Sequence, residues 1–234
     1  MLKIDRIIDY SGFSKDSNGV FYLSESDLDK VAENIILQLD ATFLFEPRPI
    51  PVLDWIEDGV FGNKYDYKDL VVPKAFGLTS FHDDAVFARD SESGLLVPIK
   101  VEANTILLND TLPETQLRFT GGHEVTHFVI HPYYFAEKRM AVAANFGYGK
   151  IIPFTPESYW LEWQANYGSA SLLMPNRALK IVASDFVQEN EILNEQDSNF
   201  WPLVHKVAEV FNVSKFAAGI RLRQQKYITN YPDY

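Results

Sequence analysis

The sequence contains no cysteine in its 234 residues. This absence excludes disulfide bonds, thiolate metal sites and cysteine nucleophiles. Any transition-metal site in this chain must therefore be built from histidine and carboxylate side chains, which are the other common zinc ligands.

Long apolar runs and an excess of positive charge are also missing. No stretch of 18 consecutive apolar residues and no signal-type apolar segment is present. Lys and Arg number 21 against 32 Asp and Glu, a net charge of −11, which disfavours broad electrostatic binding to nucleic acid or anionic lipid. We therefore expect a soluble, cytoplasmic protein whose partners include neither membrane nor nucleic acid.

The chain does carry enough apolar residues, 47% of the total, to form a substantial hydrophobic core. Residues 1–20 suggest an extended arm. Residues 26–40 place apolar side chains at helical spacing and predict an amphipathic helix capped by Ser26. Residues 51–62 show a shorter helical pattern.

Strand patterns occupy the region from residue 70 to residue 108. The predicted strands are Leu70–Gly77, Asp84–Ala88, Leu95–Val101 and Thr105–Leu108. They predict a small, mostly antiparallel sheet, with Thr105–Leu108 as an edge strand to which an extended peptide could pair. His82 lies between two of these strands, where a solvated turn is favoured over a second metal site.

A histidine pair follows the last predicted strand. His123-Glu124-Val125-Thr126-His127 forms an H-E-x-x-H motif. Residues four apart lie on one face of a helix, so both imidazoles can converge on one metal ion. Glu124 is then placed to act as general base on a water molecule held by that metal.

The flanking residues support a helix around this motif. Thr111 and Glu114 suggest an N-terminal capping box, with Pro113 in the first turn, and Pro132 ends the helix. Gly121 and Gly122 lie mid-helix, where each costs about 1 kcal/mol relative to Ala. Close approach of a neighbouring backbone would explain them.

A catalytic zinc site usually takes a third protein ligand and keeps one position open. His131 is too far along the helix, because residues eight apart are separated by roughly 12 Å. Glu162 lies in a second predicted helix, capped by Thr155 and closed by Pro175. We predict Glu162 as the third ligand. Asn166, one turn later, and His131 are predicted to orient the metal ligands from behind.

These motifs resemble the ImmA/IrrE family of metallopeptidases. The similarity is carried by R-F-T-x-x-H-E-x-x-H-x-x-x-H, by E-x-Q-A-N and by Leu172-Leu173-Met174-Pro175, and covers about residues 49–175. It implies a zinc-dependent endopeptidase with one Zn²⁺ per chain, ligated by His123, His127 and Glu162, with Glu124 as general base. The sequence departs from the family pattern in two places. Thr126 replaces a usual Gly, and Gly168-Ser169 replaces a usual Phe-Ala.

The remaining segments offer less specific signals. Residues 133–154 are rich in aromatic residues, with a short helix expected near residues 135–144, and any tyrosine there could stabilise an oxyanion. Helices are predicted at residues 177–189, 201–211 and 215–227, the last capped by Ser214. Residues 204–222 resemble a helix-turn-helix with local basic charge, including Arg221. We favour a helical buttress over DNA binding for this segment.

Together these features predict an α+β fold: a zincin-like minimal metallopeptidase core with a small antiparallel-dominated sheet, an active-site helix and a C-terminal helical extension. The predicted divisions are an arm at 1–20, a core at 21–175 and an extension at 176–234, packed on the core. The expected substrate is a protein, and the resemblance suggests a helix-turn-helix repressor. The alternatives are a metal-binding regulator with little proteolysis and a DNA-binding protein that uses the C-terminal helices.

Overall fold

The computed structural model describes residues 12–17, 19–72, 75–138, 142–145, 156–229 and 231. The chain divides into two compact units, each made of two sequence segments. The first comprises Met1–Leu28 and Pro51–Ser169, and the second Asp29–Ile50 and Ala170–Tyr234. The predicted boundaries after residues 20 and 175 cut the chain in sequence order instead, and they remain predictions.

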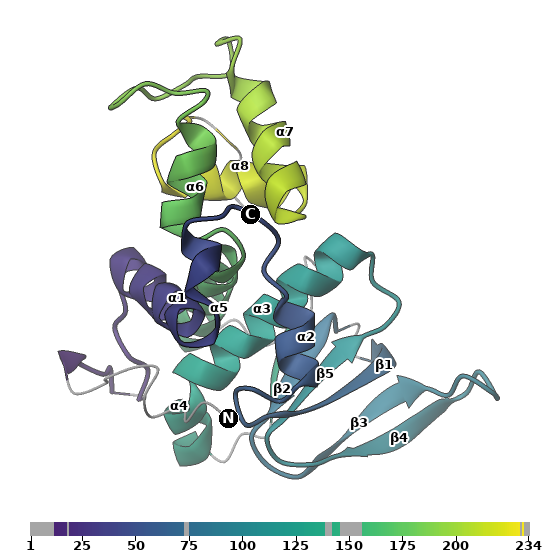
Figure 1. Ribbon diagram of the computed structural model, residues 1–234. Helices are drawn as coiled ribbons and strands as arrows, with labels where there is room; N and C mark the ends of the chain where they lie inside the picture. Colours follow the sequence, from purple (N-terminus) through teal and green to yellow (C-terminus); the bar gives the residue numbers. More distant parts are fainter. Residues whose placement is uncertain are drawn as a thin grey trace. The chain divides into compact units, whose positions relative to one another are not determined.

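The first unit contains the whole sheet and the helix with the histidine pair, so the predicted α+β class is confirmed (Figure 1). Its elements run in the order α2 (Val52–Glu57), β1 (Lys64–Val72), β2 (Gly77–Ser80), β3 (Asp84–Arg89), β4 (Leu96–Val101), β5 (Thr105–Asn109), α3 (Glu114–Ile130), α4 (Pro132–Lys138) and β6 (Val142–Asn145). Helix α5 (Pro156–Leu173) follows and continues into the second unit.

The strand order is β4-β3-β1-β5-β2-β6. All the pairings are antiparallel except that of β1 with β5, which agrees with the predicted antiparallel-dominated sheet. The predicted role of Thr105–Leu108 as an edge strand is wrong, because β5 pairs with β1 on one side and β2 on the other. The predicted strand Leu70–Gly77 is also misplaced: β1 begins at Lys64, and β2 begins at Gly77.

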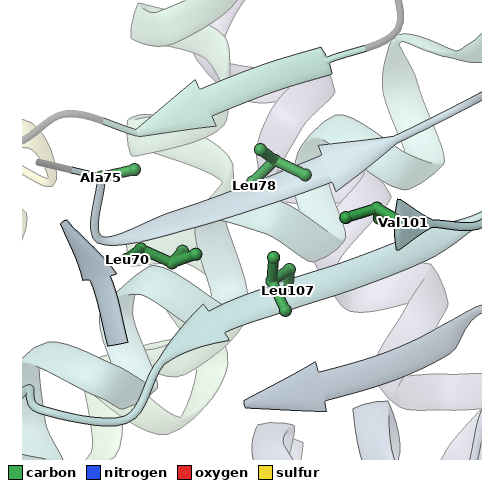
Figure 2. Close-up of a cluster of buried hydrophobic side chains, with 5 residues drawn as sticks. All are labelled: Leu70, Ala75, Leu78, Val101 and Leu107. Carbon is green, nitrogen blue, oxygen red and sulfur yellow. The ribbon is translucent and has the colours of Figure 1, made fainter. Parts of the chain in front are cut away.

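Both faces of the central strand β5 are buried. Leu107 of β5 belongs to a cluster of buried apolar side chains, drawn in Figure 2, that also includes Leu70 of β1, Ala75 before β2, Leu78 of β2 and Val101 of β4. Val86 and Ile99, from the β3–β4 hairpin, pack against this cluster. A shift in register within β1, between Asp69 and Val72, marks a bulge where β3 pairs with it, and bulges increase local bend and twist. This hairpin therefore helps to cover one face of its own sheet.

Helix α3 contacts the sheet through β2 and β5. The predicted capping box does not form, because the helix begins at Glu114 and the Thr111 hydroxyl donates to Asn109 Oδ1 at 2.8 Å. The helix ends at Ile130, and α4 starts directly at Pro132, as the proline predicted. The expected short helix at residues 135–144 is wrong in position, since α4 covers Pro132–Lys138 and β6 covers Val142–Asn145.

The second unit is helical in its described part. Its elements are the larger part of α1 (Glu25–Leu39), the short 3₁₀ helix η3 (Ala41–Leu44), the end of α5, and then α6 (Asn176–Ala183), α7 (Phe200–Phe211) and α8 (Lys215–Gln224). Ser214 caps α8 as predicted, accepting a hydrogen bond from the Ala217 N–H at 3.1 Å. Helix α1 is capped by Ser24 rather than Ser26, through its hydroxyl and the Asp27 N–H. In the described part of the chain, no helix is long and apolar enough to cross a membrane.

Candidate metal centre

Helices α3 and α5 bring the three predicted metal ligands together. His123 and His127, one turn apart on α3, lie with their Nε2 atoms 3.0 Å from each other. The Glu162 carboxylate on α5 places one oxygen 3.3 Å from His123 Nε2 and the other 3.5 Å from His127 Nε2. Among the described residues, this is the only cluster of three or more His, Cys, Asp or Glu side chains with metal-ligand spacing.

These separations suit a four-coordinate metal ion. Ligand atoms placed 2.0–2.1 Å from an ion at the centre of a tetrahedron are about 3.4 Å from each other. The two distances from Glu162 to the histidines match this edge length, and the distance between the histidines is slightly shorter. Two imidazoles and one carboxylate also form a donor set that zinc accepts. The residues present therefore fit a metal ion.

Access to this point is one-sided. The side chains of both histidines are fully buried, whereas that of Glu162 is 32% exposed. A fourth ligand, such as water or a substrate carbonyl, would therefore approach from the side of Glu162. The Glu162 side of the cluster is thus more accessible than the histidine side.

An amide on α5 orients the first histidine. Asn166 Oδ1 lies 3.0 Å from His123 Nδ1, and the oxygen can only accept, so Nδ1 carries the proton and Nε2 faces the cluster. Burial opposes charge on His123, but the Glu162 carboxylate outweighs it, so the pKa of His123 is raised. For Glu162, burial is outweighed by both imidazoles, and its pKa is lowered. Glu162 is thus held as an anion.

His131 supports the second histidine from behind. Its Nδ1 lies 2.9 Å from His127 Nδ1, and its Nε2 lies 2.9 Å from Gln164 Oε1. It is buried beneath His127 and does not belong to the metal-ligating group. Burial lowers the pKa of His131 to about 3 and also lowers that of His127. His131 is therefore a neutral hydrogen-bonding group.

Glu124 is positioned by β2, a contact that no sequence pattern indicated. The Thr79 hydroxyl donates to Glu124 Oε2 at 2.8 Å, and both residues are fully buried. Gly77 on the same strand leaves room for the carboxylate, because a Cβ there would lie 2.9 Å from Glu124 Cγ and 2.6 Å from Thr120 Cγ2. The close approach of β2 to α3 thus fixes the side chain predicted as general base.

The two departures from the family pattern face each other. A Cβ on Gly168 would lie 2.5 Å from Thr126 Cγ2. Thr126 on α3 is larger than the usual glycine, and Gly168 on α5 has no side chain where the family usually has Phe. The two changes compensate in volume, so the helices stay in close contact. Gly122 similarly faces Ser169, whose hydroxyl bonds to the Phe119 carbonyl oxygen at 2.8 Å. Close helix packing accounts for the mid-helix glycine at position 122.

Other candidate sites are less developed. His82 lies in the bend between β2 and β3 and belongs to no metal-ligating group among the described residues. Of the aromatic residues after α3, Tyr134 and Phe135 are buried, Tyr133 is exposed, and Phe146 and Tyr148 lie outside the described residues, as does the predicted cap Thr155.

Helices α7 and α8 do form a helix-turn-helix, but residues 217–222 of α8 are buried and Arg221 is fully so. Counting Arg221 in a basic surface was therefore wrong.

In this α+β unit, one helix carries the H-E-x-x-H motif, and a second helix supplies a carboxylate as the third candidate metal ligand. This is the architecture of a metallopeptidase. Comparison with family models supports this class: residues 83–223 match the IrrE N-terminal-like domain family of peptidases. The match covers more than half of the chain, which therefore belongs to this family. No curated protein matches the chain. Thr79 and Gly77 lie before the matched region.

Proposed function

We propose that the protein is a zinc-dependent endopeptidase that cleaves a cytoplasmic protein substrate. The observation that carries the proposal is the convergence of His123, His127 and Glu162 on one point, beside a buried Glu124, in a chain of a peptidase family. Three electron-pair donors so close together need a proton or a metal ion between them. Zinc is the usual ion for two imidazoles and one carboxylate with an open position.

Each residue of the site has a separate role in the proposed reaction. A bound zinc ion would polarise the scissile carbonyl and lower the pKa of a water molecule. Glu124 accepts a proton from the attacking water and delivers it to the leaving amine. Thr79 holds the Glu124 carboxylate in place for both transfers, through its hydrogen bond to Oε2. Asn166 and His131 keep the two imidazoles oriented.

The sheet offers a place for the substrate chain. Of the two edge strands, β6 pairs with β2, and Ala143 of β6 lies opposite Thr79, the residue that contacts Glu124. An extended peptide added to the free edge of β6 would run close to the metal centre. We therefore assign substrate pairing to β6 in place of β5. A helix-turn-helix repressor is the proposed substrate, following the family resemblance.

Two carboxylate variants test the proposal. Glu124→Gln removes a base but no ligand, so it should bind zinc as the wild type does and lose about 10²- to 10⁴-fold in turnover. Glu162→Ala removes a ligand and should lose both zinc affinity and turnover. Zinc affinity is measured by competition with a chromophoric chelator, and cleavage by mass spectrometry on a proteome-derived peptide mixture.

Each result has a clear meaning. Full turnover by Glu124→Gln would exclude the proposed mechanism. Equal zinc affinity in Glu162→Ala and the wild type would exclude Glu162 as a ligand. A wild-type protein that binds zinc but cleaves nothing in the mixture or in a candidate repressor would favour a metal-binding regulator instead.

A further inference from the structure

A chain of hydrogen bonds runs from the backbone near the N-terminus to the metal centre. The Gln164 amide nitrogen donates to the Phe21 carbonyl oxygen at 2.8 Å. Gln164 Oε1 lies 2.9 Å from His131 Nε2, and His131 Nδ1 lies 2.9 Å from His127 Nδ1. All four residues are at most 5% exposed, so water does not compete for these bonds.

The Phe21 carbonyl oxygen fixes which atom donates and which accepts in every hydrogen bond of this chain. A backbone carbonyl oxygen can only accept, so the NH₂ group of Gln164 faces Phe21 and its oxygen faces His131. That oxygen can also only accept, so His131 carries its proton on Nε2. In a neutral imidazole the other nitrogen, here Nδ1, is then an acceptor.

The last bond sets the state of the metal ligand. Because His131 Nδ1 accepts, His127 must donate from its own Nδ1. The proton of neutral His127 is then on Nδ1, and the electron pair is on Nε2, the atom that faces Glu162 at 3.5 Å. We propose that Gln164 is a positioning residue, anchored on the Phe21 carbonyl, that acts through His131 to hold His127 in its metal-binding tautomer. The inference rests on the metal centre proposed above.

Helix geometry explains why His127 needs an intermediary and His123 does not. Glu162 and Asn166 are one turn apart and share a face of α5, so Asn166 reaches His123 directly. Gln164 is two residues from each, and residues two apart on a helix do not share a face. It therefore meets the second histidine only through His131, which is one turn beyond His127 on α3.

The anchor belongs to a small hairpin at the start of the described chain. Lys15 and Phe21 form an antiparallel bridge, and the Asp16 carboxylate accepts a hydrogen bond from the Val20 N–H at 2.9 Å. The Phe21 ring packs edge-on against Tyr133 at 6.4 Å between centroids, with the Lys15 ammonium 4.7 Å from the Phe21 ring centroid. These contacts fix the carbonyl that orients Gln164, which lies 143 residues away in sequence.

The tautomers can be read directly by long-range ¹H–¹⁵N NMR of the metal-free protein labelled at histidine. In the wild type, His131 should carry its proton on Nε2 and His127 on Nδ1. In Gln164→Leu, which removes the acceptor, His131 should shift toward a mixture of tautomers. A wild-type His131 with its proton on Nδ1 would overturn the proposal, even if the variant failed to fold.

Zinc affinity gives a second and independent readout. Gln164→Leu should bind zinc about 10- to 100-fold more weakly than the wild type, the usual cost of losing a group that orients a ligand. Ser169→Ala is the matched control, because it removes a partly buried hydrogen bond between α5 and α3 without changing a histidine. Its zinc affinity should equal that of the wild type.

The outcomes separate this inference from the proposed function. Wild-type affinity in a folded Gln164→Leu protein would overturn the role of Gln164 while leaving the metal centre intact. A wild-type protein that binds no zinc would refute the metal centre, and the NMR tautomers would still decide whether Gln164 sets the state of His127.

Discussion

Arg221 in the second unit and the histidine pair in the first are both fully buried polar groups that face a carboxylate, but only the arginine carries a permanent positive charge. The Arg221 guanidinium donates to the Asp29 carboxylate at 2.8 Å, to Asn176 Oδ1 at 2.7 Å and to the Met174 carbonyl at 3.2 Å. Asp29 also accepts hydrogen bonds from Ser171 and Asn176. One cation meets one anion, and a donor faces an acceptor in each of these hydrogen bonds.

At the metal centre of the first unit, the hydrogen-bond donors do not match the acceptors in this way. Its hydrogen bonds from Asn166 and His131 leave the Nε2 atoms of His123 and His127 directed at the Glu162 carboxylate. When both imidazoles are neutral, electron pairs face electron pairs, and the Glu162 carboxylate raises the pKa of His123 in response. A buried group of acceptors is stable only when a proton or a metal ion lies among them. The balance of donors and acceptors thus distinguishes a structural cluster from a binding site.

The largest expected effect comes from breaking the balanced cluster. Arg221→Met should reduce the free energy of unfolding by about 3–5 kcal/mol, because it leaves the Asp29 charge, whose side chain is only 14% exposed, without its counter-ion. Urea unfolding followed by circular dichroism measures the loss. Arg177→Met is the matched control, since its ion pair with Glu33 is half exposed and should contribute less than about 1 kcal/mol. Equal losses in the two variants would contradict this reading.

A smaller effect is expected from zinc binding to the cluster of His123, His127 and Glu162. Zinc at about 100 times its Kd should raise the free energy of unfolding of the wild type by about 2.7 kcal/mol. Glu162→Ala, measured at the same zinc concentration, should gain much less, because one ligand is missing. Equal stabilisation of both proteins would mean that zinc binds elsewhere.

The smallest effect concerns the pH dependence of the balanced cluster. Burial opposes ionisation of Asp29, but Arg221 and the hydrogen bonds from Ser171 and Asn176 outweigh it, so the pKa of Asp29 is lowered from its usual value. Its contribution to stability is therefore complete above the unfolded-state pKa and is lost as the pH falls through the lower folded-state value. Between about pH 5 and pH 2, the wild type should lose more stability than Asp29→Asn. Parallel curves for the two proteins would count against an ionised Asp29.

Local features were predictable because the residues involved are neighbours along the chain. His123 and His127 share a face through helix geometry alone, and Ser214 caps α8 through a hydrogen bond to a residue three positions later. The same reasoning failed at α1, where the cap is Ser24 and not the predicted Ser26. The capping box at Thr111 failed because Asn109, at the end of β5, accepts the hydroxyl bond instead.

The order of the strands in the sheet could not be predicted from sequence patterns. A strand's hydrophobic pattern tells which faces are buried, but it does not tell which strands lie on either side. Thr105–Leu108 was therefore placed at an edge, whereas β1 and β2 both pair with it. The prediction that Arg221 contributes to a basic surface failed for a related reason. Its partner Asp29 lies 192 residues earlier, so no local pattern indicates the ion pair.

The sequence by itself determined the chemistry of this protein: two histidines one helical turn apart, a glutamate between them, and a second helix with a carboxylate and an amide at the same spacing. Only the tertiary structure decided how these groups are held. Thr79 reaches Glu124 from 45 residues away, and Gln164 reaches Phe21 from 143 residues away. Helix geometry fixes contacts within a few residues, whereas contacts between distant segments depend on how the whole chain packs.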